Sequence, residues 1–190
     1  MKAVETPQVP LKGATLWPLT IPAYRALGEA GLIPKNTELL YGQVYQKMSK
    51  SPLHSFLVQV LHDGLLLVLP AQLLLRTEQP VTCVDSEPEP DLAVVKGRKE
   101  DFRNEHPHTA ELIIEVCLSS HDYDRSKLRA YASAKVKEVW VVLAPEKQIE
   151  VHRQPVEHEY RQRSTCGPGG KLVSAAVPEF SLDLDALFSK

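Results

Sequence analysis

The chain has 190 residues, of which 43% are hydrophobic and 24% charged, and its formal net charge is −2. This size and hydrophobic content suit one compact domain with its own core. The near-neutral charge excludes a strongly basic nucleic-acid-binding protein, although a local basic patch remains compatible with it. The cysteines, Cys83, Cys117 and Cys166, form no CxxC pair, which disfavours a structural zinc site and a disulfide framework. We therefore expect a protein of a reducing compartment.

Residues 1–20 predict an extended N-terminal arm, because prolines at positions 7, 10 and 18 interrupt regular structure. This segment carries charges and lacks the apolar stretch of a signal peptide. The longest apolar stretch, Leu65–Leu75, is broken by Pro70 and Gln72 and is shorter than the ~20 residues of a membrane span. We expect a soluble, cytoplasmic protein in which residues 21–190 form a single domain.

The first half of that domain predicts two helices with a hairpin between them. A short helix over Pro22–Ala30 has Thr20 as its cap and Gly31 as its stop. Alternating residues over Glu38–Met48, around a Tyr-Gly pair, indicate a hairpin or a bent strand. Apolar residues at helical spacing then predict a longer helix that Pro52 opens and Pro70 ends.

The second half predicts a mixed α/β sheet flanked by helices. Short segments rich in Val, Ile and Leu indicate strands of one sheet, and the charged segment 97–110 indicates a loop. One helix is expected over His121–Val136. The expected strands are Leu73–Val84, Asp91–Lys96, Leu112–Leu118, Val139–Leu143 and an edge hairpin of Gln148–Arg153 with Glu159–Arg163; a turn at Gly167–Gly170 and a closing segment at Leu182–Phe188 follow.

Two carboxyl groups are candidates for chemistry. Asp91 follows Pro90 at the start of a predicted strand, where it is either a metal ligand or part of an acidic turn. Glu115 lies within the apolar strand and shares a face with Ile113 and Cys117. A buried carboxylate must pair, accept hydrogen bonds or bind a cation. Glu115 is therefore a ligand, half of a buried ion pair with an arginine, or a residue on an open face of the sheet.

The predicted helices add further candidates. Asp124, Lys127, Leu128 and Tyr131 fall on one face of the 121–136 helix, and Lys127 could reach from that face towards Glu115. The alternative is an Asp124–Lys127 pair on a solvated surface. His54 shares a helix face with apolar residues, where a histidine is either a packed boundary residue or a contact of the site.

Several segments together resemble the Uma2 family, the DUF820 group of restriction-endonuclease-like proteins. None of the segments is distinctive alone, but their order and spacing are, and the resemblance covers nearly the whole chain after residue 20. The segments are Glu38–Val44, Ser51–His54, Glu89–Val95, Glu111–Ser120, Asp124–Ala132 and Val136–Val142.

The resemblance implies a restriction-endonuclease-like core of the PD-(D/E)xK nuclease superfamily. Pro90-Asp91 is then the PD element, Glu115 the second acidic residue, and the backbone carbonyl of Val116 a further metal contact. Cys117 stands where the superfamily has lysine, and Lys127 matches the lysine that Uma2-like sequences carry on the following helix.

The activity implied is hydrolysis of phosphodiester bonds, most often in DNA, with Mg²⁺ or Mn²⁺ as the cofactor, since oxygen ligands suit these ions. Asp91, Glu115 and Lys127 are the expected catalytic residues. Gln43, His54, Asp124 and Tyr131 are accessory candidates, and Gln43 replaces an acidic residue that similar proteins usually have. Candidate cations for DNA contact are Lys96, Arg98, Lys99, Arg103, Arg125 and Arg129, although charges in such loops more often belong to a plain solvated surface.

Two alternative functions and the formation of a homodimer remain open. Gln43 and the missing strand lysine are compatible with a decayed site in a module that only binds nucleic acid or protein. A thiol hydrolase using Cys117 and a histidine is a second alternative, which the position of this cysteine within a strand disfavours. The edge hairpin at 148–163 could also pair with a second copy of the chain and form a homodimer.

Overall fold

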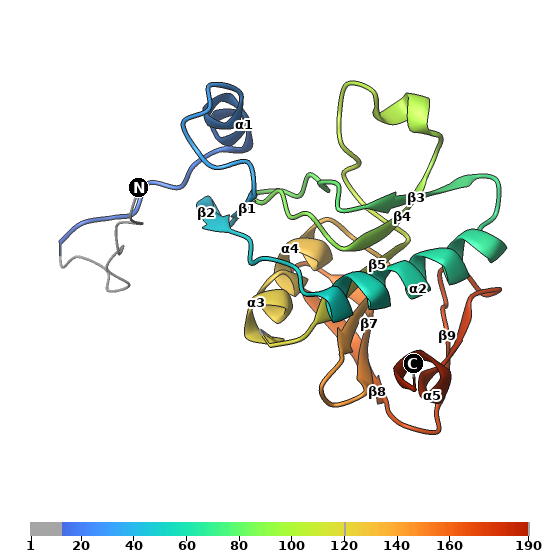
Figure 1. Ribbon diagram of the computed structural model, residues 1–190. Coiled ribbons are helices and arrows are strands. Elements are labelled where there is room, and N and C mark those ends of the chain that lie inside the picture. The colour runs from blue at the N-terminus through green and yellow to red at the C-terminus, as the bar shows by residue number, and fades with distance from the viewer. Residues whose placement is uncertain (1–12, 120, 190) are drawn as a thin grey trace.

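A six-stranded mixed sheet forms the centre of the computed structural model, which describes residues 13–119 and 121–189 (Figure 1). The strand order is β3-β4-β5-β6-β7-β8, and only β5 and β6 run parallel. The crossover between these two strands carries helices α3 and α4, as parallel neighbours require. The bounds are β3 Leu73–Thr77, β4 Leu92–Lys96, β5 Leu112–Cys117, β6 Glu138–Leu143, β7 Gln148–Val156 and β8 Glu159–Cys166. The predicted mixed α/β sheet is confirmed.

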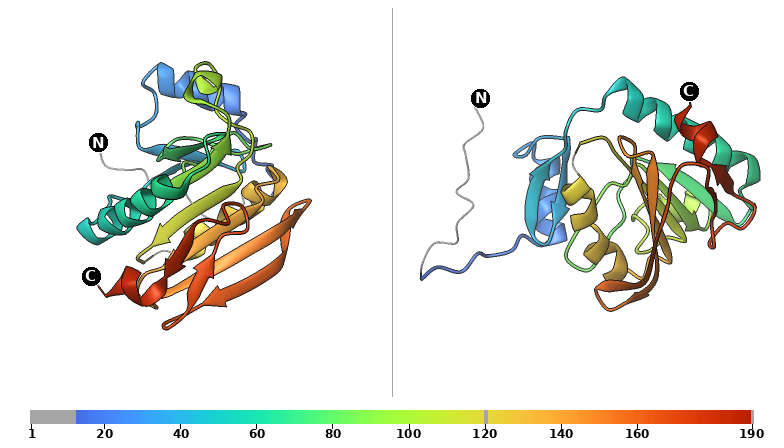
Figure 2. Two further views of the ribbon diagram at one scale, coloured as in Figure 1. Left: turned by 90° about the vertical axis from the view of Figure 1, so that its right-hand side faces the viewer. Right: turned by 90° about the horizontal axis from the view of Figure 1, so that it is seen from below.

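Helices cover both faces of this sheet (Figure 2). On one face, α2 (Pro52–Val68) buries Leu57, Leu61 and Leu65 in a core that also contains Trp140. Trp140 is fully buried and stacks on Phe180, with ring centroids 5.5 Å apart. The closing helix α5 (Leu184–Phe188) packs into the same core.

The other face of the sheet carries α3 (His121–Ser126) and α4 (Leu128–Ser133). Ala130 and Tyr131 pack there against Ile113 and Val141 of the central strands. Since β4, β5 and β6 are apolar runs buried on both faces, they form the rigid centre of the molecule. Polar side chains at the ends of these strands are therefore held on a stiff frame.

The N-terminal elements follow their local signals. Helix α1 (Ile21–Glu29) begins after Thr20, whose Oγ1 accepts a hydrogen bond from the Ala23 N–H at 3.3 Å. Strands β1 (Thr37–Leu40) and β2 (Gln43–Gln46) form the expected hairpin. Its turn residues, Tyr41 and Gly42, have φ of 54° and 74°, and a Cβ on Gly42 would collide with the Pro18 side chain. This turn therefore requires glycine at position 42.

Two predicted boundaries are wrong. The strand expected over Leu73–Val84 ends at Thr77, because Glu78 has a φ of 54° and Pro80 cannot donate to a ladder. The helix expected over His121–Val136 is two short helices that meet at Lys127. The Lys127 N–H bonds to the Asp124 carbonyl three residues back at 3.2 Å, which tightens the turn between them.

Smaller elements complete the chain. A 3-10 helix at Lys99–Phe102 lies within the charged loop, and β9 (Lys171–Val173) pairs with β10 (Ser181–Asp183) beside α5. Of the predicted N-terminal arm, residues 13–20 have no regular structure and residues 1–12 lie outside the described residues. None of the described helices has the length and apolar character needed to cross a lipid bilayer.

Candidate active site

A pocket of about 190 Å³ opens where α2 begins, where β4 begins and where β5 ends. Five carboxyl groups line it, together with His54 and three lysines. The carboxyl groups are those of Glu38, Glu89, Asp91, Glu115 and Asp124, and the lysines are Lys47, Lys50 and Lys127. They come from separate segments of the sequence, and the fold gathers them at one edge of the sheet. The segment Lys47–Ser51, between the hairpin and α2, also lines the pocket.

Asp91 and Glu115 are neighbours because of strand register. Leu92 of β4 pairs with Ile114 of antiparallel β5, so the next position along each strand places Asp91 opposite Glu115. The Val116 N–H donates to Asp91 Oδ2 at 2.8 Å, which ties the start of β4 to the end of β5. The sheet thus fixes the spacing of the two carboxyl groups.

Asp91 is held in its ionised form. Its side chain is 11% exposed, and Oδ2 lies 3.1 Å from Nε2 of His54 on the first turn of α2. Burial raises the pKa of Asp91, but the hydrogen bond and charge of His54, the Val116 N–H and Lys127 outweigh it and lower the pKa below its usual value. His54 therefore contacts the site, and is not merely a packed residue of the helix.

The pKa of Glu115 is shifted in the opposite direction. It is 2% exposed, and its Oε1 accepts a hydrogen bond from the Tyr131 hydroxyl at 2.5 Å. Burial raises the pKa of Glu115 to about 8, because Lys127 only partly compensates for burial and for the neighbouring carboxylates. A further cation beside Glu115 would stabilise its ionised form and lower its pKa again.

Lys127 stands among the carboxyl groups at the break between α3 and α4. Its Nζ lies 3.2 Å from Glu38 Oε1, 3.3 Å from Glu115 Oε1 and 3.6 Å from Asp124 Oδ1. Burial lowers the pKa of Lys127, but Glu115, Glu38 and Asp124 together raise it well above its usual value. The ammonium group is therefore charged and fixed in place.

Glu38 is a site residue that the sequence analysis missed. It is fully buried on β1, where its carboxylate accepts hydrogen bonds from the Tyr123 hydroxyl at 2.5 Å and from the Glu89 N–H at 2.9 Å. Its place in an alternating hairpin resembled that of any solvated strand residue. Only the packing of the hairpin against α3 and the segment before β4 reveals it.

The oxygen atoms left free suit a hard cation. Within the described residues, Asp91 Oδ1 and Glu115 Oε2 have no hydrogen-bond or ion-pair partner, whereas the second oxygen of each group is engaged. Five carboxyl groups share the pocket with three lysines and one histidine, and two of these lysines, Lys47 and Lys50, form ion pairs with Glu89 and Glu78. No group of three or more His, Cys, Asp or Glu side chains that could hold a metal ion occurs in the described part of the chain. Mg²⁺ is commonly held by one or two carboxylates together with water and a substrate phosphate, which this donor set allows.

The thiol of Cys117 has a passive role here. Its Sγ donates to Asp124 Oδ2 at 2.9 Å. Burial raises the pKa of Cys117, and the Asp124 carboxylate raises it further, so the reactive thiolate is disfavoured. This geometry counts against a thiol hydrolase.

A family model named Uma2 and described as "Putative restriction endonuclease" matches residues 32–185. The chain belongs to the Uma2 family. The fold of this Uma2 protein is similar to the crystal structure of "a putative nuclease belonging to DUF820" from Anabaena variabilis ATCC 29413. The TM-score is 0.72, with 20% sequence identity, 86% of this chain covered and 97% of that chain. No curated protein matches the chain. The family and the fold support a nuclease-like function.

Gln43 of this Uma2 protein does not line the pocket. It lies on β2 as an exposed residue, and its Oε1 accepts a hydrogen bond from the Tyr45 hydroxyl at 2.9 Å. We expect Gln43→Ala to change divalent-metal affinity by less than about twofold, whereas Glu38→Gln, on the paired strand, will lower it. Metal titration of the two purified variants measures this. A loss in Gln43→Ala as large as that in Glu38→Gln would contradict it.

The basic residues expected near DNA do not gather at the pocket. Lys96, Arg98, Lys99 and Arg103 lie at the end of β4 and in or beside the 3-10 helix, outside the pocket lining. Arg125 and Arg129 lie on α3 and α4 but line a different cleft. Val116 does line the pocket, and its N–H donates to Asp91 Oδ2.

Proposed function

We propose that this Uma2 protein is a Mg²⁺- or Mn²⁺-dependent nuclease that hydrolyses phosphodiester bonds in DNA. The observation that carries the proposal is the pairing of Asp91 with Glu115 across β4 and β5, with the Lys127 ammonium 3.3 Å from Glu115, in one solvent-connected pocket. The family description, which names restriction endonucleases, supports DNA as the substrate.

Asp91 and Glu115 would hold the ion through the oxygens that the protein leaves free, and the Val116 carbonyl is the expected third protein ligand. When bound, such an ion polarises the phosphate and makes coordinated water more acidic. His54 and the Val116 N–H orient the Asp91 carboxylate, while the Tyr131 hydroxyl orients Glu115. These contacts restrict both carboxyl groups to one arrangement before substrate arrives.

Lys127 supplies positive charge where the phosphate develops negative charge during hydrolysis. Its ammonium group has three protons to donate, and the neighbouring carboxylates keep it charged. Glu38 and Glu115 hold the ammonium at 3.2 and 3.3 Å, so its position does not depend on the substrate. The contact to Asp124 is longer, at 3.6 Å, so the N–H that points there can turn to a phosphate oxygen or the attacking water in the transition state.

The test is cleavage of supercoiled and single-stranded DNA by purified wild-type protein with Mg²⁺ or Mn²⁺, compared with the same reactions in a chelator. We expect cutting that requires the metal. If clean protein cuts neither substrate with either ion, the nuclease proposal is wrong. Metal binding without cutting would instead identify a module that binds but does not hydrolyse.

A further inference from the structure

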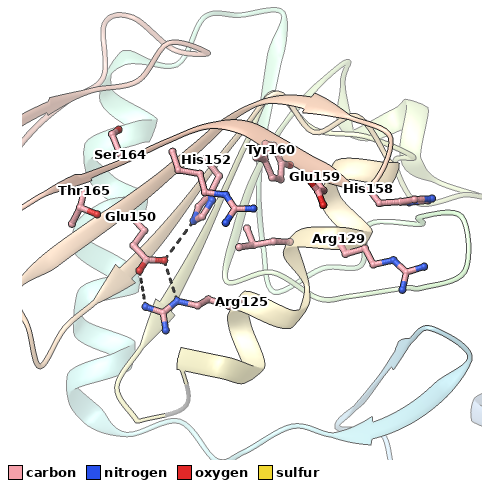
Figure 3. Close-up of a pocket in the computed structure, with 11 residues that line it drawn as sticks. Arg125, Arg129, Glu150, His152, His158, Glu159, Tyr160, Ser164 and Thr165 are labelled. Carbon is pink, nitrogen blue, oxygen red and sulfur yellow. Dashed lines mark hydrogen bonds and ion pairs between the residues drawn. The ribbon is translucent and has the colours of Figure 1, made fainter.

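A second cleft, of about 540 Å³, lies between helices α3–α4 and the β7–β8 hairpin (Figure 3). This volume is in the range of small-molecule sites, which is about 300–1,000 Å³. The helices separate it from the candidate active site. Asp124 and Lys127 line the active-site pocket, whereas Arg125, Leu128 and Arg129 line the second cleft.

A buried histidine in this cleft lacks hydrogen-bond partners. His152 on β7 is 5% exposed, and neither ring nitrogen has a hydrogen-bond partner among residues 13–119 and 121–189. An oxygen of Glu150 lies 3.5 Å from Nε2, within ion-pair range but too far for a good hydrogen bond. Buried polar groups are nearly always satisfied, so this imidazole indicates a ligand or a bound water.

Arginines supply positive charge around that imidazole. Arg163 on β8 pairs directly with His152 in the strand register, and both line the cleft. Arg125 is fixed by Glu150, which accepts two hydrogen bonds from its guanidinium at 2.6 and 3.1 Å (Figure 3). The negative charge of Glu150 is thereby balanced by Arg125. Within the described residues Arg163 has no carboxylate partner.

We propose that this cleft is a phosphate-binding site, in which Arg163 and His152 bind a phosphate group of a nucleotide or of a nucleic-acid strand. A guanidinium fork and an imidazole N–H are donors that match phosphate oxygens. The hydroxyl groups of Ser164 and Thr165 line the same cleft and add donors. The volume is large enough for a mononucleotide. The site is distinct from the proposed nuclease centre and does not depend on it.

The experiment follows the imidazole signals of His152 by NMR without divalent metal, so that turnover plays no part. Inorganic phosphate, deoxyadenosine monophosphate and a short oligonucleotide are titrated separately into wild-type protein. We expect saturable changes at His152, and binding that is weaker by about tenfold or more in Arg163→Ala, because a charge-assisted contact is lost. Arg161→Ala, which removes the same charge from β8 outside the cleft lining, should leave the affinity unchanged.

The relative affinities identify the source of the phosphate. Tighter binding of the mononucleotide indicates a free nucleotide, and tighter binding of the oligonucleotide indicates a nucleic-acid strand. The variant His152→Gln is a second test. Its affinity for the same phosphate compounds is measured by calorimetry, and we expect it to fall as well. Absence of any saturable change in the wild type, or equal affinity in Arg163→Ala and wild type, would overturn the proposal.

Discussion

Asp91→Asn and Glu115→Gln will each lower metal-dependent DNA cleavage by about a thousandfold or more, because an amide does not supply the charge that holds a divalent cation against phosphate. Each amide keeps the shape of the carboxyl group that it replaces. The amide oxygen in Asp91→Asn can still accept a hydrogen bond from the Val116 N–H, and the one in Glu115→Gln can still accept a hydrogen bond from the Tyr131 hydroxyl. The fold should therefore survive, and thermal unfolding should stay cooperative.

The matched control for these variants is Asp63→Asn on α2. Asp63 is exposed on the helix that carries His54, and it lies outside the pocket. Cleavage by Asp63→Asn should equal that of the wild type under the same conditions. Full activity in either Asp91→Asn or Glu115→Gln, with the metal still required, would show that the catalytic centre lies elsewhere.

Lys127→Met will reduce both cleavage and stability. Cleavage should fall by about a hundredfold or more, since a charge beside the reacting phosphate is lost. Without this lysine, Glu38, Glu115 and Asp124 lose their common cation, and breaking such a buried pairing costs about 3–5 kcal/mol. Urea unfolding at pH 8 without metal measures the loss.

The loss in Lys127→Met should shrink at low pH. Burial already raises the pKa of Glu115 to about 8 and also raises the pKa of Asp124, and removing the lysine raises both further. A carboxyl group with a raised pKa keeps its proton in the folded state, so the stability of the variant falls as pH rises from about 5 to 8. Lys137→Met, which removes an exposed pairing with Glu111, should change stability by less than about 1 kcal/mol at either pH. A Lys127→Met protein as stable as the wild type at pH 8 would contradict the proposed ion network.

Much of this fold follows from local patterns in the sequence. The apolar runs of β5 and β6 allow no position in a compact domain other than the centre of a sheet, and helix α2 has both its opening proline and its apolar stripe. The apolar surroundings of Glu115 were sufficient to mark it as a candidate, because a carboxylate in such a strand is costly unless something compensates for it. Asp91, in contrast, was chosen over an acidic turn only through the resemblance to Uma2 sequences.

The remaining site residues depend on contacts between distant segments. Glu38 becomes a buried partner of Lys127 only because the hairpin packs against α3, and Tyr123 reaches it from 85 positions along the chain. The break between α3 and α4 has no proline or glycine to mark it, so apolar spacing predicted one continuous helix. Gln43 was a candidate only through the resemblance, because it stands where similar proteins usually have an acidic residue, yet the strand pairing places it on exposed β2.

The two tryptophans make this protein a convenient optical reporter of its own unfolding. Trp17 is 93% exposed before α1, whereas Trp140 is fully buried against Phe180 in the core beneath α2. Indole emission shifts to longer wavelength when the ring enters water, so unfolding changes the spectrum of Trp140 while Trp17 contributes a nearly constant background. A Trp17→Phe protein will therefore show a bluer native spectrum and a larger shift on denaturation.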